Sequence, residues 1–189
     1  MATEEPAFTS SLKEGAFEVR SYPALVAAQV SVSGTRDEAS SAGFKLLAGY
    51  IFGSNTRRQS IAMTAPVVQS KPGSETIAMT APVIQTAMPG RAEAWTVRFI
   101  MPAAYTVDTL PTPNDARVQL LVLPPARYAV VMFSGMAHED DVIQRTAELT
   151  TFMAEHALRA AGPPALARYN PPWTLWFKRR NEVHIPVAP

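Results

Sequence analysis

Two long stretches of the sequence repeat the same order of features, and this duplication constrains the fold more than any other property of the chain. In residues 24–67 and again in residues 127–187, a strand pattern ends in Ser-Gly, a helical pattern and a basic run follow, and a second strand pattern ends in Pro-Val. Such a repeated strand–helix–strand unit predicts an α+β protein. We expect a twisted antiparallel sheet or distorted barrel made of two pseudo-repeated halves and flanked by two helices.

Apolar residues mark most of the expected strands by alternation or by short continuous runs. These patterns lie at residues 16–22, 24–32, 95–101, 117–123, 127–133 and 182–187.

The heptapeptide IAMTAPV occurs twice, at residues 61–67 and 77–83, and the link between the copies is rich in turn-forming residues. Both copies alternate as strands do, so we expect an antiparallel hairpin. In a symmetric register, Met63 and Met79 would face the same side and either fill the core or line a ligand groove.

The first expected helix has clear signals at both ends. Thr35 and Glu38 have the spacing of a capping box, and Gly53 is a stop signal. Its apolar face carries Phe44, Leu47 and Ile51, which pack either on the sheet or on a ligand. Gly43 and Gly49 lie inside this helix, where glycine is unfavourable, so they indicate close approach by a strand or a flat ligand. A second helix is expected at residues 139–160.

Composition excludes several classes of site. The 189 residues contain no cysteine, which rules out a disulfide framework, a thiolate nucleophile and a cysteine-bound zinc ion. The net charge of +1 gives no broad field for nucleic acid, and no apolar run is long enough for a membrane span. We expect a flexible segment at residues 1–14 and a single domain at 15–189. The polar N-terminus has no signal-peptide pattern, so a cytoplasmic location is expected.

Several motifs in order along the chain resemble the SOUL family of haem-binding proteins. They are FEVRSY at 17–22, YIFGSN at 50–55, MTAPV at 63–67, YTVDTLPTP at 105–113, YNPPW at 169–173 and RRNEV at 179–183. The likeness covers nearly the whole chain, and the doubled IAMTAPV resembles bacterial-type members. It implies a sheet or distorted barrel with two helices, similar to the effector-binding domains of multidrug-sensing regulators. It also implies binding of haem or another tetrapyrrole in an apolar groove beside the first helix.

This resemblance directs attention to one set of candidate ligand-binding residues. Apolar and small candidates could enclose the ring, and basic candidates could pair with its carboxylates. The set is Phe44, Leu47, Ala48, Ile51, Met63, Arg57, Arg58, Trp173, Lys178 and Arg179. Some family members carry a possible haem-ligating histidine where this chain has Ser21. The three histidines, His138, His156 and His184, are dispersed and indicate no metal cluster.

Three functions are compatible with these patterns. The leading hypothesis is a non-enzymatic carrier or buffer for haem or a related tetrapyrrole. A second is binding or sequestration of other flat hydrophobic molecules. A third is an enzyme that acts on a tetrapyrrole, or a hydrolase, with a buried acid such as Glu18 or Glu182. The sequence has no recognisable nucleophile–base–acid set, so we expect no catalytic activity.

Overall fold

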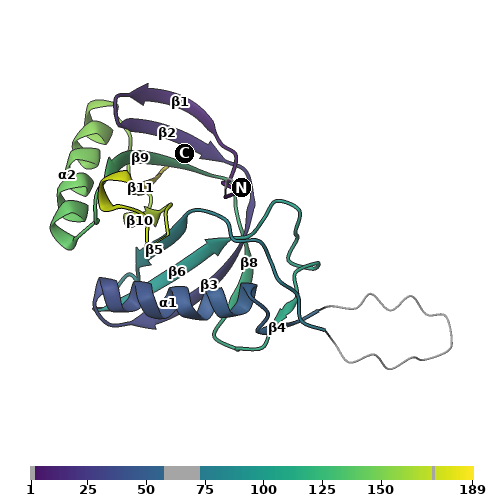
Figure 1. The fold of residues 1–189 in the computed structure, drawn as a ribbon. Helices are drawn as coiled ribbons and strands as arrows, with labels where there is room; N and C mark the ends of the chain where they lie inside the picture. The colour runs from purple at the N-terminus through teal and green to yellow at the C-terminus, as the bar shows by residue number, and fades with distance from the viewer. Residues whose placement is uncertain (1–2, 58–72, 172) are drawn as a thin grey trace, which may run out of the picture.

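One strongly curled antiparallel sheet carries a helix on each of its halves in the computed structural model of the protein (Figure 1). The structure describes residues 3–57, 73–171 and 173–189. The sheet order is β1-β2-β9-β11-β10-β5-β6-β3-β8. Its strands are β1 (Thr9–Glu14), β2 (Phe17–Tyr22), β3 (Leu25–Ser33), β5 (Val83–Ala87), β6 (Ala94–Ile100), β8 (Gln119–Leu123), β9 (Ala126–Ser134), β10 (Ala165–Arg168) and β11 (Arg180–Val187). The helices are α1 (Arg36–Ile51) and α2 (Glu139–Glu155), and a small second sheet pairs β4 (Asn55–Thr56) with β7 (Thr112–Pro113).

The two halves of the sheet are related by their strand order, which confirms the predicted α+β class and its duplication. From the central pair β5–β10, the order runs β6-β3-β8 on one side and β11-β9-β2 on the other. β3 leads through Gly34 into α1, and β9 leads through Gly135 toward α2. The φ angles of these glycines are +121° and +124°, a region that favours glycine. Each helix covers its own apolar core, α1 over β3 and β6, and α2 over β9 and β11.

Helix α1 begins and ends where the sequence indicates. Thr35 is the N-cap and makes the expected capping box with Glu38. At the other end Gly53 has a φ of +117°, and Ser54 N–H donates to the Gly49 carbonyl at 2.9 Å. This bond closes the helix in a Schellman motif.

Helix α2 is shorter than predicted, because it ends at Glu155 and not at residue 160. Ala157 takes the left-handed conformation (φ 54°), and Leu158 N–H donates to the Met153 carbonyl at 2.8 Å. This is again a Schellman motif, but alanine replaces the usual glycine, so the stop left no sequence signal. Leu158 then packs on the core beneath the helix.

The second IAMTAPV copy is not a strand along its length, contrary to prediction. Residues 77–82 contain one isolated bridge, at Thr80, and β5 begins only at Val83. Pro82 has no N–H to donate to a sheet, while Ile77 N–H donates to the carbonyl of Ile51 at 2.8 Å. The first copy, with Met63 and the expected hairpin, lies outside the described residues.

Within the large sheet, β1 and β10 occupy segments where no strand was expected. β1 lies within the N-terminal segment 1–14, which we predicted to be flexible, and pairs antiparallel with β2. It is mostly exposed, so it has none of the apolar alternation that marks a buried strand. β10 has only four residues and connects the two halves of the sheet. No helix in the described part of the chain is both long and apolar enough to cross a membrane.

Candidate functional site

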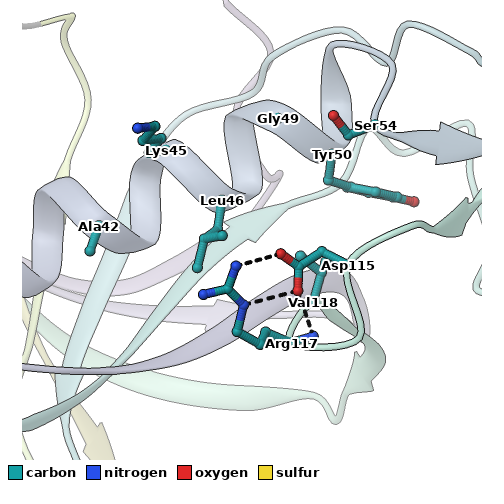
Figure 2. A pocket seen from close by; sticks show the side chains of 9 residues that line it. All are labelled: Ala42, Lys45, Leu46, Gly49, Tyr50, Ser54, Asp115, Arg117 and Val118. Atoms are coloured by element: carbon teal, nitrogen blue, oxygen red, sulfur yellow. Dashed lines mark hydrogen bonds and ion pairs between the residues drawn. The ribbon is translucent and has the colours of Figure 1, made fainter.

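A cavity of about 450 Å³ lies between the C-terminal half of α1 and the turn that precedes β8 (Figure 2). Its volume falls in the range of small-molecule sites. Helix α1 supplies Ala42, Lys45, Leu46, Gly49 and Tyr50, and the facing residues are Ser54, Asp115, Arg117 and Val118. The cavity therefore has one helical wall and one wall that is part of a loop.

The helical wall is made of small and apolar residues on one face of α1. Ala42, Leu46 and Gly49 are four and three positions apart, a spacing that brings them to the same side of a helix. A β-carbon added at Gly49 would meet only Ser54 Oγ, at 3.7 Å. Gly43 is different, because a β-carbon there would lie 2.5 Å from Val97 Cγ2 in β6. Gly43 thus accommodates the sheet, and Gly49 leaves room on the cavity side.

The facing wall carries a fixed ion pair. Arg117 Nη2 lies 2.7 Å from Asp115 Oδ2, and Arg117 Nε donates to Asp115 Oδ1 at 3.0 Å. These bonds lower the pKa of Asp115 to about 2, so the carboxylate stays ionised. Leu46 points from α1 toward this pair, whereas Lys45 points away from it (Figure 2). The cavity therefore has a largely apolar helical wall and a facing wall that carries a neutralised ion pair, and Lys45 is the cationic residue in its lining without a carboxylate partner drawn beside it (Figure 2).

The predicted ligand-binding face of α1 is mostly core. Leu47 and Ile51 are 0% and 1% exposed and pack on the sheet, so neither lines the cavity. Phe44 stacks at an angle on Phe99, with ring centroids 5.5 Å apart, and Ala48 is partly buried without lining the cavity. A cavity does lie beside α1, but none of the four residues of α1 that we predicted for ligand binding lines it.

The other predicted residues lie on separate elements. Arg57 pairs with Glu75 at 3.2 Å next to β4. Trp173, Lys178 and Arg179 lie on the loop between β10 and β11, and none of them lines the cavity. The two basic runs do not precede equivalent strands. Lys178 and Arg179 precede β11, whose counterpart in the other half of the sheet is β6, whereas the next described strand of the large sheet after Arg57 is β5. Arg58 and Met63 are outside the described residues.

The histidines lie away from the cavity. His138 and His156 cap the two ends of α2, and His156 Nε2 is 3.4 Å from Glu14 Oε2. His184 is buried in β11, with Nε2 2.8 Å from Glu182 Oε2. No three residues among His, Cys, Asp and Glu in the described chain are grouped to hold a metal ion.

A buried charged cluster on β2 and β11 was not predicted as a unit. Arg20 forms two bonds to Glu182, at 2.8 and 3.2 Å, and one to Glu18 at 2.7 Å. Tyr169 also donates to Glu182, at 2.6 Å. Burial raises the pKa of Glu182, but the bonds and charges of His184 and Arg20 outweigh burial and hold it well below 4.5. A smaller cavity of about 300 Å³ lies against this cluster.

The sequence contains a signal for one part of this cluster. Charged residues alternate with apolar ones in β2, where Glu18 and Arg20 share a face. Such alternation is typical of a strand with one side in solvent, but Glu18 and Arg20 are both buried. Only the strand order, which places β9 between β2 and β11, brings Arg20 to Glu182.

Comparison with known proteins adds four matches. The model of the SOUL heme-binding protein family matches residues 3–186. The chain is 29% identical over 173 residues to heme-binding protein 1 of Xenopus laevis, covering 90% of this chain and 84% of that protein. Among solved structures, the C-terminal domain of EcmrR has a TM-score of 0.61 at 8% identity, covering 96% of this chain and 98% of that one. A hydrolase from Listeria innocua has a TM-score of 0.56 at 14% identity, covering 100% and 94%. At these identities the two structures support the fold alone.

Proposed function

The chain belongs to the SOUL heme-binding protein family, and from this premise we propose that it binds haem or a related tetrapyrrole in the cavity beside α1. The role that fits is a non-enzymatic carrier or buffer in the cytoplasm. The observation that carries the proposal is the helical wall of Ala42, Leu46 and Gly49, whose small and apolar side chains allow a flat ring to approach the helix.

The edge of the cavity suits the carboxylates of such a ligand. Lys45 lines the cavity, and its flexible side chain, which is turned away from the Asp115–Arg117 pair (Figure 2), would have to swing toward a carboxylate to meet it; Arg117 contributes a guanidinium whose charge is partly neutralised by Asp115. Burial of the ring would supply most of the affinity, at about 25 cal/mol for each Å² of apolar surface. When bound, haem would supply an iron centre that can exchange an electron or bind a small ligand.

No histidine lines this cavity, and this observation favours a second candidate. Tyr50 lines it, but its hydroxyl donates to the carbonyl of Pro111 at 2.9 Å. Enclosure without a strong axial bond would also accept flat hydrophobic molecules that contain no iron. We therefore propose binding of such molecules as the alternative function.

An enzymatic role for Glu18 or Glu182 has less support. Both carboxylates are buried in bonds with Arg20, and both have a lowered pKa. A general acid or base works best with a pKa near the operating pH. Neither residue lines the cavity beside α1.

A spectral titration with hemin, run beside metal-free protoporphyrin, tests the proposal. We expect both to bind, and we expect Leu46→Asp to weaken each by at least about tenfold, or about 1.4 kcal/mol, because a carboxylate would be desolvated beside the ring. Ile143→Asp is the matched control, since Ile143 is 57% exposed on α2 and does not line the cavity.

The outcomes separate the two functions. Binding of protoporphyrin and hemin with similar affinity, both lost in the folded Leu46 variant, supports a site that does not depend on iron. Loss of hemin binding alone would assign an unexpected role to the metal. Unchanged affinity for both ligands in the Leu46 variant would disprove the site.

A further inference from the structure

Four large apolar side chains stand in solvent on the loop between β10 and β11. Trp173, Leu175, Trp176 and Phe177 are 83%, 57%, 61% and 52% exposed, and we call them the aromatic tip. The rings of Trp176 and Phe177 meet edge to face, with centroids 5.7 Å apart. The largest exposed apolar patch of a protein is often an interaction site.

The loop holds its shape through its own hydrogen bonds. Thr174 N–H donates to the Pro171 carbonyl at 3.0 Å, Lys178 N–H to Leu175 at 2.9 Å and Arg179 N–H to Trp176 at 3.2 Å. The Arg179 side chain also donates to the Thr174 carbonyl, at 2.8 Å. These bonds pair the N–H groups of Thr174, Lys178 and Arg179, so those three groups would not be left unsatisfied if the loop entered the interfacial region of a bilayer.

The area of the tip is small for a stable protein interface. From the typical surface of such side chains, the exposed fractions amount to on the order of 500 Å². A stable protein partner usually buries about 800 Å² on each side. Insertion into a bilayer has no such minimum, since binding scales with the apolar area that enters.

The residue types of the tip also match a lipid surface. Tryptophan concentrates at membrane–water interfaces, where its ring meets both apolar and polar groups. Lys178 follows Phe177 directly and is exposed, so its long stem can carry the ammonium group to a lipid phosphate.

We propose that the aromatic tip inserts into the interfacial region of a phospholipid bilayer, with Lys178 at the headgroups, and docks the protein on the membrane surface. This peripheral attachment is independent of the proposed ligand cavity, which lies on α1.

Tryptophan fluorescence tests the proposal directly. The chain has three tryptophans, and the third, Trp95, donates from its Nε1 to the Gly34 carbonyl. In a Trp95→Phe background, the only tryptophans left are the two of the tip, which then report on its surroundings. Vesicles of phosphatidylcholine, alone and mixed with phosphatidylglycerol, should shift the emission to the blue. Bromine on acyl carbons near the headgroup should quench it. Lys178→Ala should reduce the preference for the anionic vesicles.

Vesicle sedimentation with the natural tryptophans provides the matched comparison. Trp173→Ser with Trp176→Ser should lower partitioning by at least about tenfold, because the apolar area that enters is lost. Val122→Ser removes another exposed apolar side chain, 57% exposed on β8, and should leave partitioning unchanged. Equal thermal unfolding of the variants would show that the fold is kept.

Three results would overturn the proposal. They are no vesicle binding by the natural protein, equal loss in the Val122 variant, and binding that persists in the double tip variant. Sedimentation velocity without lipid tests the alternative that the aromatic tip binds a second copy of the chain. Self-association that is lost in the double tip variant would assign the tip to that contact.

Discussion

The backbone of Gly43 in α1 lies directly against Val97 in β6, so that a β-carbon at Gly43 would come within 2.5 Å of Val97 Cγ2. Six residues further along the same helix, a β-carbon at Gly49 would have only Ser54 Oγ near it, at 3.7 Å. Gly43 therefore allows the helix to pack closely on the sheet, whereas the site of Gly49 has room for a side chain.

Alanine substitutions at these two positions should have opposite effects on stability. Gly43→Ala should lower the free energy of unfolding by about 1–3 kcal/mol, because the helix must move away from the sheet. Gly49→Ala should raise it by about 0.5–1 kcal/mol, through the lower helix propensity of glycine. Urea denaturation measures both, and each variant controls for the other. Destabilisation of equal size at both positions would contradict this account of the helix.

The buried cluster predicts a large effect at Glu182. In Glu182→Gln, Arg20 would keep its positive charge without its main partner, so we expect a loss of about 3–5 kcal/mol in the free energy of unfolding. Asp115→Asn removes one partner of an exposed pair with Arg117 and should leave the denaturation midpoint almost unchanged. Similar midpoints for Glu182→Gln and the natural protein would show that the cluster is not coupled to folding.

The same cluster sets the response to acid. The pKa of Glu182 is lower in the folded protein than its usual 4.5, so its contribution is complete above that value and is lost as the pH falls toward the folded pKa. Unfolding free energies measured from neutral pH down to about pH 3 should therefore decline more steeply below about pH 4.5 in the natural protein than in Glu182→Gln. Parallel curves for the two proteins would argue against a lowered pKa.

Much of the fold could be predicted because it is encoded by local signals. The capping box at Thr35, the glycine at position 53 and the apolar alternation of β3 each act within a few residues. The end of α2 is different, because alanine at position 157 takes the place of the usual glycine and Leu158 packs on the core, and the late start of β5 accompanies a contact with a distant segment. Ile77 N–H, for example, is bound by the carbonyl of Ile51.

The candidate site was harder to predict than the fold. Hydrophobic periodicity identifies the face of α1 that is buried, and Leu47 and Ile51 are indeed buried, but in the core. The cavity face contains Ala42 and Gly49, whose small side chains give no hydrophobic signal. The facing wall comes from residues 115–118, and only the tertiary structure brings that turn to the helix.

Charge at the cavity should matter more than charge on the β10–β11 loop. Lys45→Ala should weaken hemin binding, and the loss should shrink as salt is added, because an exposed ion pair is screened. Lys178→Ala should leave hemin affinity unchanged. A salt-dependent loss in the Lys178 variant alone would instead place the carboxylates at that loop.

Hemin affinity should not depend on the histidines that cap α2. His138 and His156 lie at the two ends of that helix, and neither lines the cavity beside α1. Replacing both by alanine should change the hemin dissociation constant by less than about tenfold, or about 1.4 kcal/mol. His184 stays in place in this experiment, because its bond to Glu182 belongs to the buried cluster and its loss would affect folding. The Soret band should keep its position, since no axial bond would be removed. A folded double variant with a shifted Soret band and much weaker binding would show that α2 supplies an iron ligand and that the cavity beside α1 is not the site.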